Sequence, residues 1–320
     1  MGLVIFGMAT ILIGLFCALL VPLMFFGASM AAKSDHPPPP PPNLWAPSII
    51  YSGLAVTFIF LGAGSIMTKR WARALLAILS WIWLVFGLLA VGVMVVMMPG
   101  IMKSIEAVQP PGQQSLPESA KTVVLVTMLV IEVLIFVGMP LVWALFYSSK
   151  NVKATCEARD PVVRWTDRCP LPVLVLVLFA AFSALMLLIV PWSWRVALFF
   201  GAIISGPLAV IFYLMMACVF GYAALACYRL DRRGWWIYLT VTVILFGSTI
   251  ITYWCHSLSD IYSAMGYSPE QLAQLRPLIA PISGATNWTT LVFFIPFLGY
   301  LIYVRRFFPD RTRETPVANS

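Results

Sequence analysis

The chain has 320 residues, of which 61% are hydrophobic and only 10% are charged. Soluble domains carry about 25% charged residues, so this composition excludes an ordinary water-soluble fold. The formal net charge of +8 comes from short basic clusters between apolar runs. Such clusters are typical of membrane topology signals and argue against a nucleic-acid partner.

Eight apolar stretches approach or exceed the ~18–20 residues that cross a bilayer. They predict membrane-spanning helices over 2–27, 47–67, 73–98, 122–147, 171–192, 196–227, 235–255 and 281–304. The expected fold class is an all-α, polytopic integral membrane protein with about eight transmembrane helices, whose main partner is the lipid bilayer. The first stretch has no basic segment before it and exceeds a signal-peptide core in length, so it is predicted as a retained helix.

The stretch 196–227 is too long for one straight span at 1.5 Å per residue. Tilt, a kink at Pro207 or an interfacial turn is expected to absorb the excess. Pro140 and Pro296 also fall inside predicted spans, where each removes a backbone hydrogen bond. All three prolines are therefore candidate helix breaks.

The basic residues test this threading independently, because Lys and Arg collect in cytoplasmic loops. Four alternate segments hold Lys69, Arg70, Arg73, Lys150, Lys153, Arg159, Arg164, Arg168, Arg229, Arg232, Arg233, Arg305, Arg306, Arg311 and Arg313. The other side holds Lys33, Lys103, Lys121, Arg195 and Arg276. With an even number of crossings, both termini are predicted in the cytoplasm. Compact loops and this charge asymmetry favour a bacterial plasma (inner) membrane.

Landmarks recur in the two halves in the same order. Lys69 and Arg73 are matched with Arg229 and Arg233, and a proline precedes a tyrosine by seven residues in each fourth helix, at Pro140 and Pro296. The chain is thus predicted to contain two parallel four-helix repeats. The expected divisions are a first half at 1–150, a cytoplasmic connecting loop at 151–170, a second half at 171–306 and a cytoplasmic tail at 307–320.

The connecting segments carry weaker signals. Pro37 to Pro42 predict a stiff polyproline II rod, and loop 99–121 is expected to be irregular. Ser268, followed by Pro269 and Gln271, predicts the start of a short amphipathic helix. The mixed charges of segment 148–170 predict that it folds against the helix ends.

Glu132 is the only acidic residue well inside a predicted span. An ionised carboxylate at that depth is costly, so the group is expected to be neutral, hydrated or paired with hydroxyls such as Ser80, Thr127, Thr240, Thr242 or Ser248. One hypothesis makes it a proton or cation site on a transport path. The other makes it a hydrogen-bonded residue that fastens two helices.

No nucleotide-binding, metalloprotease or serine-hydrolase motif occurs in the sequence. Cys156 and Cys169 are too few for a structural zinc site, and adjacent Cys255 and His256 lack a third orienting group. No enzyme activity, metal or cofactor is therefore predicted.

Two functions remain open. Short loops and sparse chemistry favour a non-catalytic membrane subunit or scaffold that assembles with other membrane subunits. The alternative is a small-molecule or ion carrier with a mid-membrane site at Glu132, whose ligand the sequence does not identify. A carrier is expected to have a polar cavity around Glu132, whereas a scaffold is expected to have a dry centre and an apolar flank.

Overall fold

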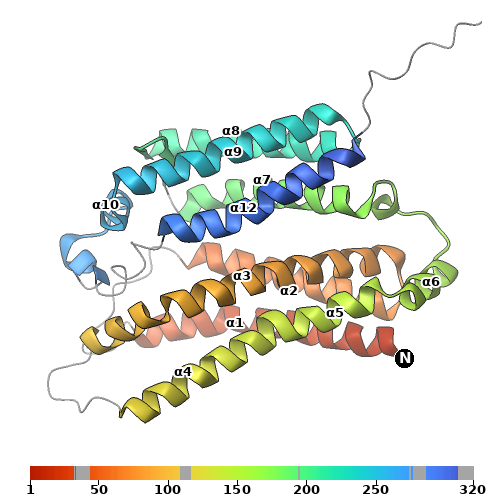
Figure 1. Cartoon of the computed structure of the whole chain (residues 1–320), viewed down its shortest axis with the longest axis horizontal. Coiled ribbons are helices and arrows are strands. Elements are labelled where there is room, and N and C mark those ends of the chain that lie inside the picture. The colour runs from red at the N-terminus through yellow and green to blue at the C-terminus, as the bar shows by residue number, and fades with distance from the viewer. Residues whose placement is uncertain are drawn as a thin grey trace, which may run out of the picture. The chain divides into compact units, whose positions relative to one another are not determined.

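The computed structural model describes residues 1–31, 33, 44–108, 117–193, 195–273, 275–276 and 286–308. Eight helices in this part of the chain are long and apolar enough to cross a membrane (Figure 1). The prediction of an all-α chain with eight helices able to span a membrane is thereby confirmed. The predicted polyproline rod and most of the predicted tail lie outside the described residues.

The chain forms two compact units, and the break between them falls at Thr166 and Asp167, inside the predicted connecting loop. Unit 1 is Met1–Thr166 with His256–Thr289, and unit 2 is Asp167–Cys255 with Thr290–Ser320.

Unit 1 contains four spans and a short helix that follows them. The spans are α1 (Gly2–Ala31), α2 (Trp45–Ile66), α3 (Arg70–Val108) and a composite fourth helix made of α4 (Glu118–Val133), a π-helical turn (Leu134–Gly138) and α5 (Met139–Ser148). They run alongside one another, with α6 (Lys150–Arg159) at one end (Figure 1). α1 and α2 pack closely, because a methyl group at Gly62 would lie only 2.6 Å from the Gly7 carbonyl oxygen. Small residues of this kind allow membrane helices to pack backbone to backbone.

Unit 2 contains α7 (Leu171–Ser193), α8 (Pro207–Tyr228), α9 (Arg232–Cys255) and nearly all of α12 (Thr286–Val304), which a 3-10 turn (Arg305–Phe307) follows. Buried polar groups link these spans: the Trp235 indole N–H donates to the Leu301 carbonyl at 2.9 Å, and the Tyr300 hydroxyl donates to the Pro172 carbonyl. The Arg305 guanidinium lies 5.7 Å from the centre of the Trp235 ring. The starts of α7 and α9 therefore meet the end of α12, with its arginine-bearing 3-10 turn, at one end of this unit.

The prediction of a single helical stretch over 196–227 is wrong before Pro207. Residues 196–205 form an antiparallel hairpin of β1 (Val196–Phe199) and β2 (Ala202–Ser205). Phe200 and Gly201 at the turn both have positive φ, as a two-residue type I′ turn requires. Pro207 is therefore the first residue of α8, where its missing N–H costs no hydrogen bond, and it does not kink a longer helix.

The hairpin lies against the last two turns of α9, which supply its missing partners. The turn amides of Phe200 and Gly201 donate to the hydroxyls of Ser248 and Thr252, at 2.8 and 3.0 Å. Ser248 in turn donates to the Leu198 carbonyl at 3.2 Å. Non-helical backbone is stable at membrane depth only when its polar groups are satisfied by protein, and these two hydroxyls meet that condition.

The connecting segments contain more helix than predicted. The prediction of irregular chain over 99–121 is wrong for 99–108, where α3 continues, and for 118–121, which form the first turn of α4. The predicted helix start at Ser268 is confirmed, because Ser268 and Gln271 exchange side-chain to backbone hydrogen bonds. A second helix, α10 (Leu258–Ala264), begins with a capping box between Ser257 and Asp260 that the sequence analysis missed.

The α2–α3 and α8–α9 turns have the same hydrogen-bond pattern. Thr68 and Leu230 both have a φ of 55° and occupy the same position in a Schellman motif. The bond from Lys69 N–H to Gly64 O has its counterpart from Asp231 to Ala226, each at 2.9 Å. Equivalent positions are thus 162 residues apart, as Thr68 and Leu230 are. The predicted repeat paired residues 160 apart, which differs by two residues from the offset between these two turns.

Candidate functional site

The fourth span of unit 1 is irregular where the sequence predicts a break. Within the π-helical turn, the Met139 N–H donates to the Leu134 carbonyl, five residues back instead of four. Pro140 follows in the first turn of α5 and has no N–H to donate. The break therefore takes the form of a widened turn, a feature frequent at functional sites.

α3 meets this turn at Gly87, where the two backbones approach without a side chain between them. A methyl group at Gly87 would overlap the Phe136 carbonyl oxygen. In a regular α-helix this carbonyl would accept from residue 140, which is proline. A Cα–H of Gly87 therefore lies against a carbonyl that proline deprives of its usual donor, and such contacts recur between closely packed helices.

Glu132 lies in the last turn of α4, directly before the π-helical turn. It belongs to a half-buried stripe with Leu125 and Leu129, which continues through buried Pro140 and Ala144 on the side of the helix that packs against α3. Its Oε2 atom is shielded from solvent and has no hydrogen-bond partner among the described residues. A shielded, unpaired carboxyl oxygen is costly in an apolar setting.

Two of the hydroxyls that the sequence analysis proposed as partners of Glu132 form hydrogen bonds elsewhere. Ser80 donates to the Leu76 carbonyl of its own helix at 2.7 Å, and Ser248 holds the hairpin of unit 2. The buried Thr242 hydroxyl, also in unit 2, has no partner among the residues described. None of these three hydroxyls therefore supplies the missing partner of Oε2.

A buried polar network ties all four spans of unit 1 together near the basic end. The Ser65 hydroxyl donates to the Leu3 carbonyl at 3.1 Å, so the Tyr147 hydroxyl must be the donor in its 2.8 Å bond to Ser65. Arg73 donates to the Tyr147 carbonyl at 3.4 Å. Each of these polar groups bonds to another on a neighbouring helix, so the network fastens the four spans to one another.

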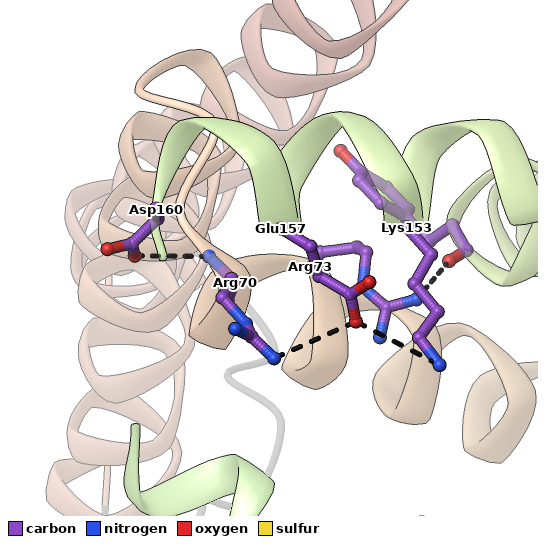
Figure 2. Close-up of polar contacts among 6 residues, drawn as sticks. Arg70, Arg73, Lys153, Glu157 and Asp160 are labelled. Atoms are coloured by element: carbon purple, nitrogen blue, oxygen red, sulfur yellow. Dashed lines mark hydrogen bonds and ion pairs between the residues drawn. The ribbon is translucent and has the colours of Figure 1, made fainter. Parts of the chain in front are cut away.

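α6 packs on the start of α3 at the same end, through charged residues. Glu157 lies between Arg70 and Lys153, with nitrogen-to-oxygen distances of 3.7 and 3.9 Å (Figure 2). These pairs are long and partly exposed, so each contributes at most about 1 kcal/mol. Segment 148–170 thus folds against a helix end, as its composition predicted.

Asp160 supplies the helix cap that α3 lacks. Lys69, directly before α3, has no side-chain acceptor, and the Arg70 N–H donates to Asp160 Oδ2 at 3.4 Å (Figure 2). Arg164 contacts the other carboxylate oxygen at 3.3 Å. Desolvation alone would raise the pKa of Asp160, but these hydrogen bonds and the positive charges of Arg164 and Lys69 outweigh it and hold the pKa below its ordinary value.

The remaining sequence candidates carry less chemistry. Pro296 lies inside α12, and the helix continues through it. Cys156 and Cys169 are buried free thiols, and burial raises the pKa of each, which lowers its reactivity. No group of three or more His, Cys, Asp or Glu side chains that could hold a metal occurs in the described ranges.

Sequence reasoning missed the hairpin and the Gly87 contact. The hairpin has a usable signal, since Phe200 and Gly201 separate two short runs rich in strand-forming residues. The Gly87 contact joins distant helices, and a single sequence gives no sign of such a pairing. Comparison of the chain with protein-family models, with curated proteins and with solved structures finds no match.

Proposed function

We propose that the chain is a non-catalytic membrane subunit or scaffold, built to assemble with other membrane proteins in a bacterial plasma membrane. The observation that carries the proposal is the contrast within unit 1. The Ser65 and Tyr147 hydroxyls and the Trp143 indole bond to groups on neighbouring helices, whereas α4 presents an exposed apolar flank. That contrast was the expected mark of a scaffold.

The flank consists of the α4 residues that point away from α3. Val123, Val126, Met128 and Val130 each expose half or more of their surface, and the span from Ser119 to Ser148 has no buried residue in its most apolar stretch. Contact with α3 is closest at α5 and decreases toward α4. A helix so loosely held in its own unit is the natural surface for a partner helix.

Orientation and duplication belong to the same proposal. Each unit gathers its basic turns at one end, which supports cytoplasmic termini under the positive-inside rule. The matching turns at Thr68 and Leu230 support a repeat of two parallel four-helix units. A subunit made of two such units has two similar helix pairs, α2–α3 and α8–α9, that partner proteins can contact.

Tryptophan substitution along the flank tests the assembly role. Lipid accommodates a larger side chain, whereas a packed interface does not. Val126→Trp and Val130→Trp are expected to reduce the high-mass species extracted in mild detergent and resolved by native electrophoresis. Leu19→Trp, at an exposed position on α1, is the matched control. A wild-type chain that migrates alone, with all three variants unchanged, contradicts the proposal.

A carrier is the second candidate, and the unpaired Oε2 of Glu132 beside a π-helical turn is the observation that favours it. Proteoliposomes made with wild type, Glu132→Gln and the control Glu157→Gln separate the two functions. The subunit proposal expects the same background proton flux for all three. A wild-type flux that Glu132→Gln abolishes and Glu157→Gln retains replaces the subunit by the carrier.

A further inference from the structure

A groove of about 450 Å³ lies between α7 and α8 in unit 2, a size within the range of small-ligand sites. Its walls are apolar side chains of both helices, among them Leu188, Trp192, Ile211 and Leu214. Arg195 and Gly206 close one end of it, beside the hairpin.

The groove extends from the headgroup level of the membrane to acyl-chain depth. Leu214 is seven residues inside α8, about 10 Å from Pro207 at 1.5 Å per residue, so the apolar walls lie at acyl-chain depth. Arg195 and Trp192 lie at the helix ends, where an indole is stable at the headgroup level. This end is opposite the α8–α9 turn with its arginines.

Arg195 is the charged group of the groove, and its placement needs an explanation. Basic residues are scarce on this side of the predicted membrane topology, so the positive-inside rule does not account for it. Its side chain is exposed, and its carbonyl accepts from Gly206, which fixes the backbone beside the start of α8. The positive N-terminal end of the α8 dipole adds to the potential of the guanidinium charge.

We infer that this groove binds an anionic phospholipid, with one acyl chain against α7 and α8 and the phosphate on Arg195. An arginine fork matches a phosphate in geometry and charge, and the walls match a hydrocarbon chain. Gly206 has a φ of 69° and no side chain, and a methyl group there would meet no atom within 4 Å, so the space beside Arg195 is open. The inference concerns unit 2 alone and holds whether the chain is a subunit or a carrier.

Native mass spectrometry of the full chain tests whether Arg195 recognises an anionic headgroup. The delipidated protein is titrated with phosphatidylglycerol and with phosphatidylcholine of the same chains. Wild type is expected to retain phosphatidylglycerol preferentially. Arg195→Gln is expected to weaken that lipid roughly tenfold, the worth of a charge-assisted hydrogen bond, while Arg195→Lys restores part of the preference. Arg276→Gln, an exposed arginine of unit 1, is the control and is expected to match wild type.

A second set of variants tests the contact of the acyl chain with the groove by adding a bulky side chain. Ile211→Trp fills the groove from an exposed position, so folding is not at risk, and it is expected to lower retention of both lipids. Leu225→Trp, at an equally exposed position on the same helix but outside the groove, is expected to leave retention unchanged. Equal retention by wild type, Arg195→Gln and Ile211→Trp overturns the inference. A wild type that does not distinguish the two headgroups overturns it as well.

Discussion

At Gly87 a single hydrogen atom separates α3 from the backbone of the fourth span, and the Phe136 carbonyl occupies the space that any side chain would need. Gly87→Ala must therefore push the helices apart at the turn that Pro140 has already loosened. We expect it to lower the free energy of unfolding by about 1–3 kcal/mol, the usual cost of overpacking.

Denaturant unfolding in detergent, followed by tryptophan fluorescence, measures that loss. Gly92→Ala is the matched control, because it adds the same methyl group to the same helix at a position where the methyl would meet no other part of the chain within 4 Å. Equal stability of the two variants would show that the close contact is absent.

Asp160 makes part of the stability of unit 1 depend on pH. Its pKa in the folded chain is below the ordinary 3.8, so its stabilising charge is fully present above about pH 4 and is lost as the pH falls through the lower, folded value. Asp160→Asn keeps an acceptor for the Arg70 N–H but removes that charge. We expect the variant to melt at a lower temperature than wild type from pH 5 to 7, with the difference shrinking below pH 4.

Melting temperatures of the two proteins between pH 3 and 7 measure this difference. Glu157→Gln serves as the control, because its ion pairs are exposed and weak. A gap between wild type and Asp160→Asn that is constant down to pH 3 contradicts the assignment of the effect to the Asp160 charge.

Among the elements, the two Schellman turns differ in one reciprocal detail. In unit 1 glycine precedes the turn and alanine follows it, at Gly64 and Ala72; in unit 2 Ala226 precedes and Gly234 follows. A methyl group at Gly64 would lie 2.6 Å from the Ala72 Cβ. The helix crossing thus has room for one methyl group, on either helix.

This predicts a rescue. Gly64→Ala alone is expected to destabilise the chain by about 1–3 kcal/mol. Adding Ala72→Gly is expected to recover most of the loss, since only the far edge of the Trp71 ring, 2.8 Å from the new methyl group, then has to move. Unfolding free energies of the two single variants and the double variant form the test. Additive losses would exclude a shared methyl site.

The same elements show how far the sequence could lead. Apolar length alone locates membrane helices, because each span must satisfy its own backbone in lipid, so the spans were predictable to within a few residues at most ends. Hydropathy does not distinguish Val196–Ser205 as a hairpin from the same residues as a helix, and the partners that make the hairpin possible, Ser248 and Thr252, are about 50 residues away.

The candidate site was predictable only where one residue suffices. Glu132 was evident as the single acid inside a span, and Pro140 as a break in it. That the break would be a π-helical turn, and that Gly87 would lie against it, depends on how α3 packs, which spacing along one helix does not reveal.

At the scale of the whole molecule, the proposed topology can be tested with a cysteine that the chain already has. Cys255 is exposed at the end of α9, on the side predicted to be extracytoplasmic. A membrane-impermeant maleimide applied to intact cells is expected to label Cys255. In a Cys255→Ser background, Lys153→Cys on α6 is expected to react only after the membrane is permeabilised. Labelling of both positions from the same side contradicts the threading.

The hairpin also determines when unit 2 can be completed during synthesis. Phe200 leaves the ribosome 48 residues before Ser248, which at 5–20 residues per second is a delay of roughly 2–10 s. Until α9 is inserted, the amides of Phe200 and Gly201 have water as their available partner. We therefore expect nascent chains arrested before Ser248 to keep this segment open to proteases, and chains long enough for all of α9 to have left the ribosome to protect it.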